Sequence, residues 1–372
     1  MKKLAVIGAN KPLECFYRQA KDLGYYLIGI AYEEGAVCKK YCDKFYPVSF
    51  ADKEAVLEIC KKEQIAGIIS FSLESALPTL IYVAQSMGLV SNSFECAKKL
   101  ENKYSMRECF TANGIPNPEY KIVSCKDDLE EINIPYPCIV KPVDSGGSQG
   151  VTKVNNFNEL KNAFDRAIEY SRKGGVIIEQ YIDGREFSVE YISHNGKHYH
   201  LQITDKTTSG EPYFVELAHH QPAQISMDMA NRIKCMVEKA LTALSIENSA
   251  SHTEIKLNSK GELYIIEIGA RMGGDYITSD LVRLSTGYDM VKGCIELATG
   301  DFRIPEINDK YFSGIYFYSK LTPYIADIIY NSKMYPDIVA SELESTQLPD
   351  TKSNADRRGY FIYRSINGKM EF

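Results

Sequence analysis

The sequence predicts an α/β protein, α+β overall, in which a parallel-sheet lobe is followed by two α+β subdomains and a small β-rich C-terminal lobe. Apolar runs and amphipathic segments alternate from residue 1 to about residue 95, which favours a parallel sheet with helices on both faces. Ile115–Pro118 is a rigid connector into a new region, and the tail from Tyr311 is rich in aromatic residues. We therefore predict four units: 1–95, 96–178, 179–310 and 311–372.

The composition narrows the class of protein. The 372-residue chain is 44% hydrophobic and 25% charged, as expected of a soluble protein with two or three packed lobes. Its net charge of −6 gives no electrostatic reason to expect nucleic acid or a membrane as a partner. The apolar run Leu4–Ala9 is too short for a signal peptide or a membrane span. Ten irregularly spaced cysteines indicate a reducing cytoplasm, not a disulfide framework or a zinc site.

The first lobe alternates short strands and helices. We expect strands at Leu4–Ile7, Tyr26–Ala31 and Gly67–Phe71 and helices at Pro12–Leu23, Asp52–Glu63 and Ser75–Met87. The first strand ends in Gly8–Pro12, which lacks the glycine spacing of a dinucleotide site, so a Rossmann-type dehydrogenase is poorly supported. Ser72, Glu74 and Ser75 follow the third strand, where ligands of open α/β sheets bind; an ordinary helix cap is the alternative for each.

The later elements follow from the same two periodicities. We expect strands at Cys138–Val143, Val176–Tyr181, Phe187–Ile192 and Gly359–Arg364, and helices at 96–114, Asn158–Ser171, Met227–Leu244, Asp280–Thr286 and Met290–Thr299. Asn102 is a candidate N-cap in the first of these helices. Lys206–Gly210 has the composition of a mobile polar loop. The aromatic residues of the tail are expected to form a core and not a nucleic-acid platform.

The stretch from Ser251 to Asp275 predicts a β-hairpin with two opposed acids. Period-two alternation places Glu254 on one strand and Glu267 on the next, around a turn at Asn258–Gly261. In a symmetric hairpin Asn258 faces Leu263, and the two glutamates face each other. Like charges directly opposite destabilise a sheet, so a divalent cation between them is the expected compensation. The alternative is a surface hairpin with two solvated acids.

A glycine-rich loop follows a strand that contains a lysine. The strand Cys138–Val143 carries Lys141 and leads into the small-residue loop Ser145–Gly150. Small residues let backbone amides turn toward an anion, and a nearby lysine can reach the same phosphate. The loop residues that we assign to this site are Ser145, Gly146, Gly147 and Ser148.

Two further segments could contact ligands. Adenine is commonly held by the backbone of a segment between two lobes, with a carboxylate nearby for ribose, and the run Glu179–Ile182 followed by Glu186 could serve in this way. A plain strand–turn–strand hairpin is the alternative. The adjacent histidines His219 and His220 could bind metal or transfer protons. Because no partner lies at ligand spacing, we expect His220 to line a substrate pocket or to be exposed.

Together these pieces resemble the ATP-grasp superfamily. The resemblance rests on NKYSMRECFTANGIPNP, PCIVKPVDSGGSQGV, VIIEQYIDGREFSVE and HTEIKL…IIEIGARMGG, in this order. It covers nearly the whole chain and is closest to the carbamoyl-phosphate-synthetase-like carboxylate–amine ligases, including the L-amino acid ligases. It implies ATP with one or two Mg²⁺ ions, which Mn²⁺ could replace, small-molecule carboxylate and amine substrates, a cytoplasmic location and a homodimer formed through the first lobe.

The resemblance also implies roles for single residues. Lys103 and Lys141 would bind the phosphates of the nucleotide, and Ser145–Gly150 would form a lid over them. Gln180, Tyr181 and Ile182 would surround adenine, with Glu179 at its amino group. Glu186 would bind ribose. Glu254 and Glu267 would bind magnesium, and Arg271 would steady the transferred phosphoryl group and the substrate carboxylate. Gly273 and Gly274 would line the substrate pocket.

One position departs from the family pattern. Glu-x-Asn-x-Arg is usual, but here Gly269 takes the place of the asparagine, so one metal ion loses a side-chain oxygen. We expect an ATP-dependent ligase that forms an amide through an acyl phosphate, on amino acids or a small carboxylate. The alternatives are a nucleotide-binding protein with impaired catalysis and an ATP-grasp enzyme that activates bicarbonate or formate.

Overall fold

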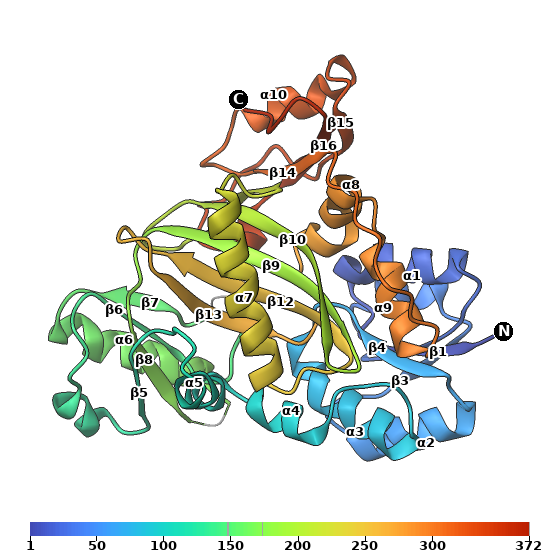
Figure 1. Cartoon of the computed structure of the whole chain (residues 1–372), viewed down its shortest axis with the longest axis horizontal. Helices are drawn as coiled ribbons and strands as arrows, with labels where there is room; N and C mark the ends of the chain where they lie inside the picture. Colours follow the sequence, from blue (N-terminus) through green and yellow to red (C-terminus); the bar gives the residue numbers. More distant parts are fainter. Residues whose placement is uncertain (147–148, 173, 372) are drawn as a thin grey trace.

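The computed structural model describes residues 1–146, 149–172 and 174–371 (Figure 1). The first lobe contains a parallel four-stranded sheet, which confirms the prediction from its alternating pattern. The strand order is β3-β2-β1-β4, with β1 (Lys3–Ile7), β2 (Tyr26–Ala31), β3 (Lys44–Pro47) and β4 (Gly67–Ser70). The sequence does not predict β3, because this strand is short and both of its ends are exposed.

Helices cover both faces of this sheet. They are α1 (Glu14–Asp22), α2 (Lys53–Glu63) and α3 (Leu77–Met87). Leu4 and Val6 of β1 belong to the core around α1, whereas Ala5 and Ile7 belong to the core around α2 and α3. Alternate residues of a strand point to opposite faces, so one apolar run supplies both cores.

The single helix expected at 96–114 is wrong, because the chain forms two helices there. They are α4 (Phe94–Lys99) and α5 (Lys103–Ala112). Asn102 is the N-cap of α5, as predicted: its φ is −160° and its side chain accepts a hydrogen bond from the Ser105 N–H. A residue in this extended conformation cannot continue a helix from α4, and the helix therefore divides.

A second, antiparallel sheet carries the glycine-rich loop. Its strands are β5 (Tyr120–Val123), β6 (Cys138–Pro142), β7 (Thr152–Val154) and β8 (Val176–Gln180), in the order β5-β8-β6-β7. The helix α6 (Phe157–Tyr170) packs on one face, where Leu160 and Phe164 join Val140 and Ile178 in a common core.

The third sheet has eight strands, in the order β13-β12-β9-β10-β11-β14-β16-β15. These strands are β9 (Arg185–His194), β10 (Lys197–Thr208), β11 (Glu216–Gln221), β12 (Ser249–Leu257), β13 (Leu263–Gly269), β14 (Phe312–Tyr318), β15 (Ile338–Leu343) and β16 (Gly359–Ser365). Hydrogen bonds between β11 and β14 join the C-terminal strands to the rest, so the aromatic tail extends this sheet. The mixed architecture confirms the predicted fold class.

The two faces of the large sheet differ in polarity. The helix α7 (Met227–Ala243) crosses the strands β9, β10 and β12 (Figure 1), and Phe187, Val189 and Tyr191 of β9 pack beneath it. The intervening residues Ser188 and Glu190 are also buried but face the other side. The remaining helices are α8 (Val282–Thr286), α9 (Met290–Ala298) and α10 (Ile325–Tyr330).

Two of the later elements differ from the prediction. The mobile loop expected at Lys206–Gly210 is wrong at its start, because β10 continues to Thr208 and the Lys206 side chain is buried. The helix expected at Asp280–Thr286 is preceded by a π-helical turn at Ile277–Leu281. Among the residues that the structure describes, no helix combines the length and the apolar character needed to cross a membrane.

Gly184, between β8 and β9, predicts a local sensitivity of the fold. Its φ is +90°, and a Cβ atom there would lie 2.1 Å from the backbone oxygen of Leu257. We expect Gly184→Ala to lower the free energy of unfolding by about 2 kcal/mol or more, since backbone strain adds to a clash that a side-chain movement cannot relieve. Gly196 also has a positive φ but open space around it. Gly196→Ala should therefore cost less, and equal costs in urea unfolding would contradict this account.

Candidate active site

The predicted acid pair is present on the hairpin. Glu254 on β12 lies directly opposite Glu267 on β13, which confirms the prediction of opposed acids. Nearer the turn the predicted register is wrong, because Leu263 faces Leu257 and not Asn258. Both glutamate side chains are partly exposed, at 31% and 23%, so they lie at the boundary between the sheet and solvent.

A β-bulge causes the change of register. The pairing shifts after Glu254 so that Ile255 faces Ile265, which leaves Ile266 as the extra residue of β13. The bulge has a specific partner, because Arg107 of α5 donates a hydrogen bond to the Ile266 carbonyl oxygen at 2.6 Å. Arg107 is almost completely buried, and its hydrogen bond attaches α5 to the hairpin.

Protein cations accompany both acids. Lys103 Nζ lies 3.3 Å from Glu267 Oε1, and Lys206 Nζ lies 3.1 Å from Glu254 Oε1. His252 Nε2 is 3.7 Å from Glu254, and although burial opposes it, Glu190 raises the pKa of His252 to about 9. The Lys206 ammonium in turn holds the pKa of Glu254 well below its ordinary value. The expected compensation of the like charges is thus partly supplied by the chain itself.

The segment after β4 reaches the same place from the first lobe. Ser72 has a left-handed backbone with φ of 45°, and Glu74 and Ser75 begin a 3-10 turn. Burial raises the pKa of the Glu74 carboxyl, and the negative charge of Glu267 raises it further. Glu74 is therefore close to the acid pair, and Ser72 and Ser75 flank it; their role in substrate binding stays a prediction.

Lys141 and Glu179 form a buried ion pair beside the hairpin. Lys141 Nζ lies 2.7 Å from Glu179 Oε2, and Arg107 Nε lies 2.9 Å from Glu179 Oε1. Burial alone would raise the pKa of Glu179, but Arg107 and Lys141 outweigh it and hold the value at about 2. Both oxygens of the carboxylate already have partners, so the predicted contact of Glu179 with adenine would have to share one of them.

The predicted adenine segment lies at the end of β8, where the chain leaves the four-stranded antiparallel sheet. The Gln180 N–H donates to Glu119 O at 2.8 Å and the Tyr181 N–H to Pro137 O at 3.2 Å. Ile182 is buried. With those two N–H groups engaged in the protein, the predicted backbone contacts to adenine must use the carbonyl groups or the Ile182 N–H.

The glycine-rich loop is connected to the acid pair by a lysine. Lys103 Nζ donates to the Ser145 carbonyl oxygen at 2.8 Å as well as contacting Glu267. Gly146 is exposed. Gly147 and Ser148, also assigned to the phosphate site, lie outside the described residues.

Lys206 is the centre of a buried charge network. Its Nζ lies 2.8 Å from Glu186, 2.7 Å from Glu216 and 3.1 Å from Glu254. Burial would lower the pKa of Lys206, but the three carboxylates, Glu186 foremost, raise it well above its ordinary value. One ammonium group therefore connects the predicted ribose and metal acids with an acid that the sequence analysis did not assign.

Arg271 and the glycines around it are closely packed. Its Nε is buried and has no hydrogen-bond partner among the described residues, while Nη1 donates to Met272 O at 3.1 Å. A Cβ on Gly269 would lie 3.0 Å from this Nε, so the missing asparagine leaves room for the arginine. A Cβ on Gly273 would lie 2.8 Å from His252 Nδ1, so only glycine fits there.

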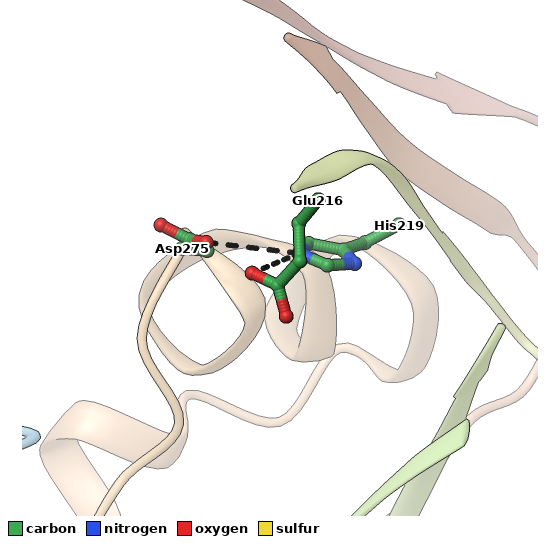
Figure 2. Close-up of side chains that lie close together, drawn as sticks. All are labelled: Glu216, His219 and Asp275. Carbon is green, nitrogen blue, oxygen red and sulfur yellow. Dashed lines mark ion pairs between the residues drawn. The ribbon is translucent and has the colours of Figure 1, made fainter. Parts of the chain in front are cut away.

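A cluster of Glu216, His219 and Asp275 lies next to this network (Figure 2). His219 Nε2 is 3.6 Å from Glu216 Oε2 and 3.9 Å from Asp275 Oδ2. Asp275 directly follows Gly274, which brings the predicted glycine segment to the cluster. The His219 ring is fully buried, and neither of its nitrogens has a hydrogen-bond partner among the described residues.

The cluster is electrostatically mixed. Burial would lower the pKa of His219, but Asp275 and Glu216 outweigh it and raise the pKa. Glu216 also pairs with Lys206, and Arg357 binds both oxygens of Asp275, at 2.7 and 3.0 Å. Because two cations already occupy these carboxylates, a metal ion here would have to displace them.

His220 lies on the opposite face of β11 from this cluster. Its Nδ1 is 3.1 Å from the Tyr363 hydroxyl, and its ring packs against Tyr316. It is buried, so the expectation of an exposed residue is wrong, and burial lowers its pKa. The pairing of His219 with Glu216 was not predicted, because regular alternation places strand residues three apart on opposite faces. The bulge after Thr207 changes the pairing of this part of β11 with β10. The spacing Glu216-x-x-His219 is the signal that could have identified the pair.

Comparison with known proteins identifies a domain of the chain. The family model described as ATP-grasp domain matches residues 134–280. Alanine–anticapsin ligase of Bacillus subtilis (strain 168) is 27% identical over an alignment of 251 positions, which covers 60% of this chain and 52% of that protein. D-alanine–D-alanine ligase of Thermoanaerobacter pseudethanolicus is 28% identical over 199 residues, covering 50% of this chain and 54% of the relative. The chain thus spans about half the length of these curated relatives.

A solved structure matches over almost the whole chain. L-amino acid ligase from Bacillus licheniformis is 26% identical, with a TM-score of 0.82 and coverage of 98% of this chain and 93% of that one. N5-carboxyaminoimidazole synthetase from Staphylococcus aureus, complexed with ADP, has a TM-score of 0.79 at 17% identity, which shows the same fold. The chain therefore carries an ATP-grasp domain at residues 134–280, within a fold that it shares with an L-amino acid ligase.

Proposed function

We propose that this protein is an ATP- and Mg²⁺-dependent carboxylate–amine ligase that acts on an amino acid. The observation that carries the proposal is the direct pairing of Glu254 with Glu267, with Lys103 and Lys206 beside them. Two partly exposed carboxylates with oxygen atoms at one edge suit Mg²⁺. Glu254 and Glu267 would hold the ion, which when bound neutralises charge on the ATP phosphates.

The proposed reaction has two steps. A substrate carboxylate oxygen attacks the terminal phosphorus of ATP, and the bond to ADP breaks, giving an acyl phosphate. A neutral amine then attacks the acyl carbon, the bond to phosphate breaks, and the amine loses a proton as the amide forms. Lys103, Lys141 and Arg271 would position the phosphates and stabilise their charge, and the Ser145–Gly150 loop would exclude water. No nucleophilic side chain is required.

The cluster of Glu216, His219 and Asp275 supports an amino acid as the substrate. An ionised carboxylate has acceptor positions beyond those used by one partner, so the N–H groups of an amino acid's ammonium group could share Glu216 and Asp275 with Lys206 and Arg357. The cluster is joined to Glu254 through Lys206, so a bound amino acid would lie near the predicted phosphate site.

Replacement of one metal acid tests the reaction. We expect Glu267→Gln to lower the rate of amino-acid-dependent ADP release by about 100-fold, because the ion that neutralises the phosphate charge would lose one of the two anionic ligands that hold it. Glu262→Gln is the matched control, because Glu262 is on the same hairpin but exposed. This variant should release ADP at the wild-type rate. ATP binding without ADP release for any amino acid or carboxylate would favour the nucleotide-binding alternative. Release with bicarbonate or formate alone would favour the second alternative.

Substrate analogues test the amino-acid assignment. For an amino acid that supports ADP release as the carboxylate substrate, with the amine substrate held constant, we expect the α-hydroxy analogue to have a kcat/KM about 100-fold lower, since a hydroxyl group cannot supply the charge that Glu216 and Asp275 attract. The N-methyl amino acid keeps the charge and serves as the control for size. If the hydroxy acid were used as efficiently as the amino acid, the cluster would not be an ammonium site.

A further inference from the structure

The segment 353–357 of the C-terminal region contacts the candidate ammonium site. Arg357 donates from Nη2 to Asp275 Oδ1 at 2.7 Å and from Nη1 to Asp275 Oδ2 at 3.0 Å. Its Nη1 also approaches the backbone oxygen of Glu216 at 3.4 Å, and its Nε donates to Asn354 O at 2.9 Å. The guanidinium group lies 3.8 Å from the ring centre of Phe317. A two-point ion pair of this kind fixes the direction of a carboxylate as well as its distance.

Asn354 holds the other acid of the cluster. Its Nδ2 donates to Glu216 Oε2 at 3.1 Å, and its Oδ1 accepts from the Glu216 N–H at 3.0 Å. The segment itself is fixed by a capping box, in which Asp356 accepts hydrogen bonds from the N–H and hydroxyl of Ser353. One short turn therefore orients both carboxylates of the cluster.

The backbone at Asp275 has an unfavourable conformation that these contacts help to hold. Asp275 and Tyr276 have φ values of 48° and 64°, a left-handed conformation that non-glycine residues rarely adopt. The C-terminal region supplies contacts to both: Arg357, just before β16, binds the Asp275 carboxylate, and Tyr360 of β16 packs on Tyr276 with ring centres 4.4 Å apart. Without Arg357 the aspartate would lose its two-point partner and relax toward an ordinary backbone conformation, carrying its carboxylate away from His219.

We propose that Arg357 and Asn354 are positioning residues that hold Asp275 and Glu216 in place to bind the ammonium group of the amino-acid substrate. This inference rests on the proposed function. It assigns a role in substrate selection to the turn between β15 and β16, which lies beyond the matched ATP-grasp domain. Arg357 acts through Asp275 and has no direct contact with the reacting atoms.

The test compares KM values for two substrates. In the full-length protein, Arg357→Met should raise KM for the amino acid about tenfold or more and leave KM for ATP within about twofold, because only the ammonium site loses its geometry. Arg357→Lys, which keeps the charge but not the two-point contact, should fall between wild type and Arg357→Met. The Arg358 side chain donates to the backbone oxygens of Ala355 and Arg357 and so supports the same turn, which makes it unsuitable as a control. Arg303 is exposed and lies outside this segment, so Arg303→Met is the control for loss of an arginine and should leave both KM values unchanged.

A double-mutant cycle separates positioning from direct contact. If Arg357 acts through Asp275, then Asp275→Asn and the double variant Asp275→Asn/Arg357→Met should have the same KM for the amino acid. Additive effects would overturn the positioning role, and so would equal changes in both KM values or no change in either. Should Arg357→Met fail to fold, Asn354→Ala replaces it, with the same tenfold rise expected and an unchanged KM counting against the proposal.

The two proposals can fail separately. Wild-type protein that releases ADP with amino acids while Arg357→Met and Asn354→Ala keep the wild-type KM would overturn this inference and leave the proposed function standing. Wild-type protein that binds ATP but releases no ADP with any amino acid would overturn both.

Discussion

The buried ammonium group of Lys206 is the interaction on which the rest of the site depends. It joins acids from β9, β11 and β12, so three strands converge on one charge. Removing one member of a buried ion pair commonly costs about 3–5 kcal/mol, because the remaining charge is left without a partner. Here one lysine serves three carboxylates, and its loss would leave all of them facing one another across the polar side of the sheet.

From this lysine the charges alternate in sign across the sheet. The row consists of Lys206, Glu216, His219, Asp275 and Arg357. The other end of the network reaches Glu254 and Glu186, the residues predicted to meet the metal and ribose. Lys206 is therefore the shared ion-pair partner of the predicted nucleotide-binding acids and of Glu216 in the cluster.

Local patterns were sufficient to predict much of this arrangement. The opposed glutamates follow from period two and a turn signal, and the parallel sheet follows from alternating apolar and amphipathic segments. The division of the helix at Asn102 was not predicted, although Asn102 was identified as a capping residue. A cap marks the start of a helix and therefore implies a break before it. The register between the bulge at Ile266 and the turn could not be predicted from the local pattern. The hydrogen-bond partner of the bulge, Arg107, lies 159 residues earlier in the chain.

Long-range ion pairs were the least accessible part of the site. Lys206 lies in a polar stretch that has the composition of a loop, and only the three acids from other strands make it a buried strand residue. Asp275 and Arg357 are 82 residues apart, and no local periodicity connects them. The roles predicted for Gln180, Ile182 and Glu186 stay predictions, because they concern contacts with a nucleotide.

The hydrogen bonding between β11 and β14 has a consequence for any shortened form of the chain. A fragment that stopped at residue 310 would keep every motif of the matched domain. It would, however, leave β11 as an exposed edge strand with unpaired amide and carbonyl groups. Such edges recruit strands from other molecules. Self-association would then be the expected behaviour of the isolated domain, and the C-terminal strands act as its built-in protection against it.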